Sequence, residues 1–194
     1  MLMHCVVVHT IPSASDRAAQ SDAARNALHH ALRHLDVLTP GPPGQLHLVR
    51  GPRGKPAVAL EGVAVSLSHT PSLAVAAASI GTGQIGVDVE ACRPLSEAGL
   101  RASILSPRER ATPDLLRAWV RKESVSKATG DGLWADARLI NVDSAGAVGP
   151  VIPYPGQTLY GWVQNIDVGA AHRAAITVLD VPRPPNVLVI ALDD

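Results

Sequence analysis

The sequence predicts an α+β protein built from two similar lobes, and two patterns in its 194 residues support this fold class. One segment in each half has apolar residues at helical spacing, and several short β-rich segments surround each of them. The halves 1–83 and 84–194 therefore share a similar order of elements, although no repeat of single residues joins them. We expect 1–83 to form an N-terminal lobe and 84–194 a C-terminal lobe, with a ligand site at the seam between them.

The composition excludes several classes of protein. The formal net charge is zero and the hydrophobic content is 46%, so the chain is no polycation and has enough apolar residues for a core. Two cysteines, Cys5 and Cys92, do not make a disulfide framework or a metal cluster. The start, MLMHCVVVHT, lacks the cationic region of a signal peptide, and no apolar run is long enough to span a bilayer. We therefore expect a soluble cytoplasmic protein with no nucleic-acid or membrane partner.

The N-terminal half begins with a β-rich segment over residues 2–9, which predicts a strand, followed by a helix over 15–35. The helix is predicted from apolar residues that recur every three or four positions: Ala24, Ala27, Leu28, Ala31, Leu32 and Leu35. TPGPPG, residues 39–44, is composed of turn formers and predicts a loop. Short β-rich runs then predict strands over 45–50, 63–68 and 73–80.

The C-terminal half begins with a predicted strand over 84–90, which Pro94 ends before a short polar helix. SPRE, residues 106–109, has the form of a capping box, and a long helix over about 114–129 follows, with Gly130 as its C-cap. Three further strands are predicted, over 133–142, 159–165 and 173–180. The tail VPRPPNVLVIALDD predicts either a last strand or a docked segment.

Two carboxylates lie in the segment GQIGVDVEACRP. Side chains alternate along a strand, so Asp88 and Glu90 share one face. Carboxylates this close repel each other unless a cation or water screens them, and Mg²⁺ prefers one or two carboxylates together with phosphate oxygens and water. On spacing alone, a solvated acidic face of an edge strand explains the pattern as well, and it is the commoner case.

The segment WVRKESVSKATGDGL contains two of the three lysines of the chain, Lys122 and Lys127, against fourteen arginines. On a helix, Trp119, Glu123 and Lys127 lie on one face, where Glu123 and Lys127 can form a surface ion pair worth about 0.3–0.5 kcal/mol. The scarcity of lysine favours a functional explanation. An ammonium is a compact charge on a flexible stem and can reach a phosphate, whereas a guanidinium is a planar fork.

Two further segments carry groups that suit an anion. GPRGKP is a Gly- and Pro-rich turn with Arg53 and the third lysine, Lys55, but it lacks the glycine spacing of a P-loop. Ser68 and His69 end a predicted strand, and the sequence around them has no nucleophile elbow, so we expect phosphate donors rather than a hydrolytic pair. A basic surface turn is the alternative for the first segment.

Taken together, these segments resemble the Sfp-type 4′-phosphopantetheinyl transferases, whose pattern is roughly GKP, SH, G[IV]D[IV]E and WxxKE[AS]xxKxxGxGL in this order. The last element is matched here at Trp119, Lys122, Glu123, Ser124, Lys127, Gly130, Gly132 and Leu133. The resemblance covers about residues 15–180 and implies a pseudo-dimeric α+β fold. It also implies transfer of the phosphopantetheine arm of coenzyme A to a serine hydroxyl of an apo acyl or peptidyl carrier protein, with release of 3′,5′-ADP.

The resemblance implies a role for each candidate residue. Asp88, Glu90 and Glu123 would bind Mg²⁺, or Mn²⁺ in its place, and Glu123 would also be the base for the carrier serine. Lys127 would contact the bridging phosphate and assist the leaving group. The coenzyme A phosphates would be held by Arg53, Lys55, Ser68, His69 and Lys122. The family's N-terminal lysines for the 3′-phosphate are absent here, so Arg25, with Arg17, is expected to replace them.

Two alternatives to the transferase stay open at the level of the sequence. One is a catalytically weak module that binds coenzyme A or a carrier protein, and the other is an unrelated Mg²⁺-dependent phosphodiesterase that uses the same three carboxylates. The sequence does not identify the carrier, which can belong to fatty-acid, polyketide or peptide synthesis. An internal pseudo-dimer makes a monomer the simpler expectation.

Overall fold

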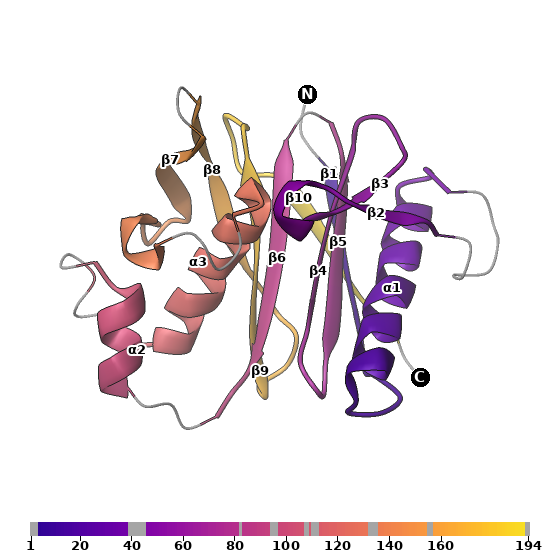
Figure 1. Cartoon of the computed structure of the whole chain (residues 1–194), viewed down its shortest axis with the longest axis horizontal. Helices are drawn as coiled ribbons and strands as arrows, with labels where there is room; N and C mark the ends of the chain where they lie inside the picture. The colour runs from indigo at the N-terminus through magenta and orange to yellow at the C-terminus, as the bar shows by residue number, and fades with distance from the viewer. Residues whose placement is uncertain are drawn as a thin grey trace.

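The computed structural model describes residues 4–38, 46–81, 83–93, 97–106, 109, 113–131, 136–154 and 157–192. The N-terminal helix lies on one side of the molecule and the two later helices lie on the other, with strands between and beside them (Figure 1). This arrangement confirms the predicted α+β class. No helix in the described ranges has the length and apolar character needed to cross a membrane.

Helices and strands make up most of the described residues. The helices are α1 (Arg17–His34), α2 (Glu97–Ile104) and α3 (Leu115–Thr129), with the 3₁₀ turns η2 (Pro52–Gly54) and η5 (Ala137–Leu139). The strands are β1 (His4–Thr10), β2 (Leu48–Arg50), β3 (Pro56–Val58), β4 (Val63–His69), β5 (Ala74–Ile80), β6 (Gln84–Ala91), β7 (Ala147–Tyr154), β8 (Gln157–Ile166), β9 (His172–Leu179) and β10 (Asn186–Ala191).

The first four-stranded sheet has the order β10-β1-β5-β4, and α1 packs on it. The helix begins after Asp16, whose carboxylate accepts hydrogen bonds from the amides of Ala18 and Ala19 and so caps the first turn. Its buried stripe faces alternate residues of the strands, which confirms the helical period seen in the sequence. The shared core contains Ala27, Leu28, Ala31, Leu32, Val6, Val8, Ala76 and Ala78.

The C-terminal tail forms a strand, the first of the two expectations for it. β10 pairs with β1 in parallel, with His4 opposite Asn186 and Val8 opposite Ile190. The tail therefore belongs to the sheet that is otherwise made by residues 4–80. Chain segments from the two ends of the sequence lie side by side in it (Figure 1).

The second four-stranded sheet has the order β6-β9-β8-β7, and α3 packs across β6 and β9. The predicted limits of this helix are confirmed to within a residue. Asp114 caps its start by accepting a hydrogen bond from the Arg117 amide, and Gly130 ends it in the left-handed conformation at φ 82°. The face of α3 toward the sheet is buried among Val120, Val125, Ala128, Ala175 and Leu179.

The two sheets meet where β4, the edge of the first, lies beside β6, the edge of the second (Figure 1). A third apolar cluster joins them and includes Val75 and Ala77 of β5, Val87 and Val89 of β6, and Ile176 and Val178 of β9. This boundary between β4 and β6 is called the seam below.

The sequence mispredicted the region after α3. We expected a strand over 133–142, but Ala137–Leu139 forms the turn η5, and only Val142 makes a bridge, to Val148. The strand β7 was missed because Pro150 and Pro153 lie within it. Proline is tolerated there because β7 is an edge strand whose pairing with β8 shifts register. The short β3 was missed as well. The predicted loop at 39–44 and the break at Pro94 lie outside the described residues.

Candidate functional site

The seam brings together side chains from the two most distinctive motifs of the sequence. Asp88 and Glu90 come from β6, and Glu123 and Lys127 lie one turn apart on α3. The helix can lie against the strand because Gly86 has no side chain. A Cβ built on Gly86 would overlap the carbonyl oxygen of Ser124 and the amide nitrogen of Ala128.

Asp88 is buried, with 5% of its surface exposed, and its two oxygens have different surroundings. Oδ1 accepts hydrogen bonds from Lys127 Nζ at 2.7 Å and from Ser68 Oγ at 3.0 Å. Oδ2 is buried and has no hydrogen-bond partner within the part of the chain that the structure describes. A buried carboxylate oxygen without a partner is costly unless water or a cation meets it, so this oxygen fits the role of a cation ligand.

Glu90 lies two residues further along β6 and contacts α3 through Trp119. The indole Nε1 of Trp119 donates a hydrogen bond to Glu90 Oε1 at 3.3 Å. Trp119 precedes Glu123 by four residues, so the helix face predicted from the sequence, with Trp119, Glu123 and Lys127, is the face turned toward the acidic residues of β6.

Glu123 is influenced by both of the other carboxylates. Burial, the charge of Asp88 and the charge of Glu90 raise its pKa to about 7, and the charge of Lys127 opposes them. Within the described ranges, no three His, Cys, Asp or Glu side chains are grouped closely enough to hold a metal ion by themselves. Magnesium takes only one or two carboxylates when phosphate and water complete its shell, so the donors present fit a cation shared with a phosphate ligand.

Lys127 lies inside the acidic group. Besides Asp88, its ammonium donates to Ser68 Oγ at 2.8 Å and to the carbonyl oxygen of Leu67 at 3.5 Å. The side chain therefore neutralises part of the negative charge at the seam and bridges α3 to β4. Ser68 contacts Asp88 and Lys127 rather than standing apart as a phosphate donor.

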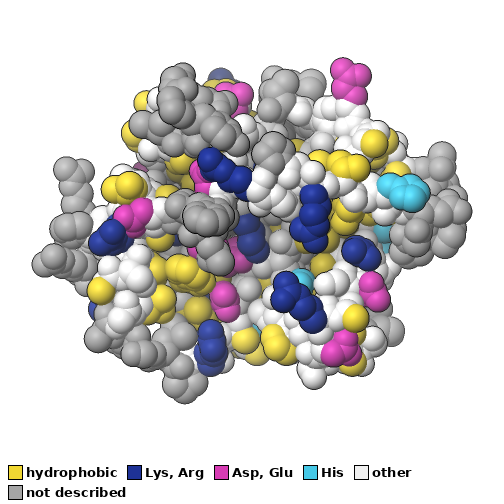
Figure 2. Space-filling model, viewed as in Figure 1, with side chains coloured by type: hydrophobic (Ala, Val, Ile, Leu, Met, Phe, Trp, Pro, Cys, Tyr) yellow, Lys and Arg dark blue, Asp and Glu magenta, His cyan; other side chains and the backbone are white. Residues whose placement is uncertain are grey.

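The turn that carries Arg53 and Lys55 reaches the C-terminal end of α3. Lys55 Nζ donates a hydrogen bond to the carbonyl of Ala128, and Arg53 pairs with Asp131. Burial lowers the pKa of Lys55 to about 8. A cavity of about 200 Å³ opens here, lined in part by Arg53, Lys55, Lys127 and Gly130. Figure 2 shows Lys and Arg side chains gathered over the centre of this face, with Asp and Glu among them.

His69 points to the opposite side of β4 from Ser68 and contacts α1. Its Nδ1 lies 2.8 Å from Gln20 Oε1. Burial lowers the pKa of His69, and the positive charges of Lys127 and Arg17 lower it further, so these cations act on the same region. Arg25 lies further along α1 with 59% of its side chain exposed, and its described ion pair is with Asp22 at 3.9 Å. Arg17 is therefore better supported than Arg25 as a partner for an anion here.

Lys122 does not face this region, and the expectation that it holds a phosphate does not fit its geometry. It is 2% exposed, and its ammonium donates to three acceptors: Ile104 O at 2.7 Å, Glu109 Oε2 at 2.7 Å and Ala137 O at 2.9 Å. All three N–H groups are thus used. Lys122 joins the end of α2, the SPRE segment and η5, which is a structural role.

Glu109 is a residue whose importance was only indirectly visible in the sequence. The capping-box pattern predicted that its carboxylate meets the backbone of Ser106, and Ser106 N does donate to Glu109 Oε2 at 2.9 Å. The same oxygen also receives Lys122. Nothing in the pattern indicated that second contact. Pro107 of the box, and Gly132 and Leu133 of the later motif, lie outside the described residues.

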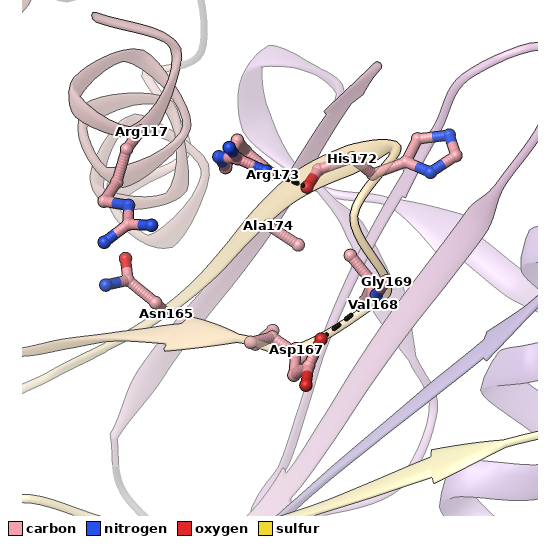
Figure 3. Close-up of a pocket in the computed structure, with 9 residues that line it drawn as sticks. Arg117, Asn165, Asp167, Val168, Gly169, His172, Arg173 and Ala174 are labelled. Atoms are coloured by element: carbon pink, nitrogen blue, oxygen red, sulfur yellow. Dashed lines mark hydrogen bonds between the residues drawn. The ribbon is translucent and has the colours of Figure 1, made fainter. Parts of the chain in front are cut away.

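A second cavity, of about 300 Å³, lies beside the N-terminal part of α3 and was not predicted. Its lining includes Arg117, Asn165, Asp167 and Arg173, which come from α3 and from the β8–β9 region (Figure 3). Both arginines approach Asp114 Oδ2, at 3.5 Å for Arg117 and 3.2 Å for Arg173. The pair between Arg173 and Asp114 attaches the start of α3 to β9.

Comparison with known proteins shows what the chain is similar to. Residues 84–177, which contain both acidic motifs, match the model of the 4′-phosphopantetheinyl transferase superfamily. The 4′-phosphopantetheinyl transferase HetI of Nostoc sp. (strain PCC 7120) is 36% identical over 135 residues, which are 62% of this chain and 54% of that protein. The chain thus spans about half the length of this curated relative. Both matches make this part of the chain similar to the 4′-phosphopantetheinyl transferase superfamily.

Proposed function

We propose that this protein transfers the 4′-phosphopantetheine arm of coenzyme A to a serine hydroxyl of an apo acyl or peptidyl carrier protein and releases 3′,5′-ADP. The observation that carries the proposal is the convergence of Asp88, Glu123 and Lys127 at the seam, because two separate motifs supply two carboxylates and a cation to one place. The name of the Nostoc relative supports the same activity.

Coenzyme A would bind with its phosphates toward the basic side of the seam. Lys55, Arg53 and Lys127 line one cavity at the end of α3, and Arg17 and His69 lie on its α1 side. Cations on several elements suit a ligand that carries a pyrophosphate and a separate 3′-phosphate. Arg17 and Arg25 were both expected near the 3′-phosphate, and the effect of Arg17 on the pKa of His69 supports Arg17.

The carboxylates at the seam would hold Mg²⁺, or Mn²⁺ in its place. Asp88, through its orphaned Oδ2, and Glu123 are the leading ligands, with Glu90 beside them. When bound, the metal supplies charge neutralisation at the pyrophosphate. Without a cation these acidic groups would repel the same pyrophosphate.

The side chains of the protein have two tasks in the reaction. Glu123 accepts the proton of the carrier serine as its oxygen bonds to the phosphorus that bears pantetheine. Lys127 stabilises negative charge on the oxygen of the departing 3′,5′-ADP as its bond to that phosphorus breaks. Transfer at phosphorus depends mostly on positioning and electrostatic stabilisation, which a rigid strand and helix provide.

The proposal includes an arrangement of two lobes in a monomeric, cytoplasmic pseudo-dimer. It is supported by a helix packed on a four-stranded sheet on each side of the seam: α1 on the first and α3 on the second. The division at residue 83 then needs one amendment. Because β10 pairs with β1, residues 186–191 would complete the N-terminal lobe.

Intact-mass spectrometry tests the activity directly. An apo carrier protein is incubated with this chain, coenzyme A and Mg²⁺, and with a chelator in a parallel sample. Addition of one phosphopantetheine, dependent on metal and lost in Glu123→Gln, is the expected result. Cleavage of coenzyme A without a carrier would instead indicate a phosphodiesterase. Binding of coenzyme A without transfer to any of a panel of fatty-acid, polyketide and peptide-synthetase carriers would indicate a binding module.

A further inference from the structure

Two serine hydroxyls close the seam between the sheets. β4 and β6 are not paired as strands, yet Ser66 Oγ accepts a hydrogen bond from Val87 N at 2.9 Å, and Ser68 Oγ accepts one from Val89 N at 3.3 Å. The two serines are buried, with 3% and 7% of their surface exposed. Each serine accepts the hydrogen bond of a β6 amide that faces away from β9, so the two serines have equivalent structural roles.

Of these two serines, Ser68 also contacts the side chains of Asp88 and Lys127. A hydroxyl has one donor and two acceptor positions. Ser68 donates to Asp88 Oδ1 at 3.0 Å and accepts from Lys127 Nζ at 2.8 Å and from Val89 N. All three positions are therefore occupied, which leaves the hydroxyl no group to offer to a coenzyme A phosphate.

These contacts fix the carboxylate of Asp88 in one orientation. Oδ1 is held by two donors, Ser68 Oγ and Lys127 Nζ, while the buried Oδ2 has no hydrogen-bond partner among the described residues. If the Ser68 hydroxyl were absent, Oδ1 would lose its neutral donor. Lys127 would then be the one described donor to the carboxylate, and an ammonium competes with a metal cation for it.

We infer that Ser68 is a positioning residue for the metal site, which orients Asp88 from the opposite sheet and keeps Lys127 on Oδ1 alone. The inference rests on the proposed role of Asp88 as a metal ligand. It assigns to Ser68 a task different from phosphate binding, and it makes the cation site depend on the contact between β4 and β6. Residues that orient a metal ligand typically alter metal affinity about ten- to hundred-fold when they are removed.

Ser66 provides a matched control, because it makes the same contact with β6 without touching a carboxylate. The variants Ser68→Ala, Ser66→Ala and Ser68→Thr are compared with the wild type. Mn²⁺ binding is measured by electron paramagnetic resonance, with and without saturating coenzyme A and with no carrier present. Thermal unfolding in chelator reports the loss of the seam hydrogen bond separately.

We expect Ser68→Ala and Ser66→Ala to lower the melting temperature by similar amounts, whereas only Ser68→Ala weakens Mn²⁺ binding, by about tenfold or more. Ser68→Thr, which keeps the hydroxyl, should restore most of the Mn²⁺ affinity. Equal Mn²⁺ affinity in Ser68→Ala and Ser66→Ala would overturn the inference and leave the proposed transferase intact. A wild-type protein that binds no Mn²⁺ under either condition would overturn both.

Discussion

Gly86 of β6 lies directly against the backbone of α3 at Ser124, so closely that a Cβ on the glycine would overlap the Ser124 carbonyl oxygen. Asp88 is two residues from Gly86, and Glu123 is adjacent to Ser124. The glycine therefore sets the separation between β6, which carries Asp88, and α3, which carries Glu123 and Lys127. In the sequence Gly86 is an inconspicuous member of GVDVE. In the fold it determines how near α3 can lie to β6.

Substitution of Gly86 by alanine tests this packing. Because backbone atoms of α3 occupy the space, we expect Gly86→Ala to lower the free energy of unfolding by about 1–3 kcal/mol or more. It should also reduce transfer sharply. Urea denaturation measures the free energy of unfolding, and the carrier assay measures transfer.

Gly99, in α2, is the control, because a Cβ there meets no atom within 4 Å. Gly99→Ala should be neutral or stabilise the helix, and equal behaviour of the two variants would contradict the explanation.

Glu123 should destabilise the metal-free protein at neutral pH. Its folded pKa is about 7, against an ordinary value of 4.5. Between these values the folded chain binds more protons than the unfolded chain, so stability falls as pH rises through this window. Glu123→Gln removes the penalty. In chelator at pH 8 we expect it to be more stable than the wild type by about 1–2 kcal/mol, after allowance for partial exposure to solvent, and no different below pH 4.5.

Glu109 provides a control of opposite sign for that experiment. Burial opposes ionisation of Glu109, but hydrogen bonds from Lys122 and Ser106 outweigh it and lower the pKa. Glu109→Gln should therefore destabilise the protein at pH 8. Urea denaturation of both variants at pH 8 and at about pH 4, below the ordinary pKa of a glutamate, tests both predictions. Loss of stability in Glu123→Gln at pH 8 would mean that its carboxylate is stabilised by contacts that outweigh Asp88 and Glu90.

Local signals in the sequence predicted the elements that bear the site. The helical period over 15–35 located α1 to within two residues, and the glycine after Thr129 located the end of α3, because amphipathic spacing and a left-handed cap act within one element. The alternation that places Asp88 and Glu90 on one face is equally local. These features require no knowledge of the partner element.

Features that depend on the partner element could not be predicted in this way. The contacts of Ser68 and Lys122 join segments that are far apart in the chain. The sequence of the tail likewise does not indicate that β10 pairs with β1. Lysine scarcity correctly singled out unusual positions. It did not distinguish Lys127, which contacts the seam carboxylate of Asp88, from Lys122, which holds three segments together.

The buried position of Lys122 leads to a separate prediction about stability. Lys122→Met keeps much of the apolar stem but removes the donor to the carbonyls of Ile104 and Ala137 and leaves Glu109 Oε2 with the Ser106 amide alone. Removal of one partner of a fully buried ion pair costs about 3–5 kcal/mol, and because Glu109 is 21% exposed we expect a loss near the lower end of that range in urea denaturation. Lys122→Arg should not rescue it, because a planar guanidinium cannot meet three acceptors arranged around an ammonium.

Arg138 is the control for Lys122, because it also forms an ion pair, with Asp136, but on the surface. Exposed pairs contribute little, so Arg138→Ala should leave the melting temperature almost unchanged. If Lys122→Met were as stable as Arg138→Ala and failed to bind coenzyme A, the original expectation of a phosphate contact would be restored.

Lys55 should make coenzyme A binding dependent on pH above neutrality. Its pKa is about 8 because the side chain is buried, so the ammonium is mostly protonated at pH 7 and mostly neutral at pH 9. A phosphate binds the protonated form. The dissociation constant for coenzyme A should therefore rise above pH 8, with a slope that approaches about tenfold per pH unit for the loss of one proton.

Calorimetric titration of coenzyme A at pH 7, 8 and 9 measures this slope, in a range where the phosphates have completed their own ionisation near pH 6. Lys55→Arg is the decisive comparison, because a guanidinium keeps its charge throughout and should bind with nearly constant affinity. Thermal unfolding at each pH verifies that both proteins remain folded. The same slope in Lys55→Arg would assign the titration to another group. Constant affinity in the wild type would remove Lys55 from the phosphate site, and its bond to the Ala128 carbonyl would then be the reason for its burial.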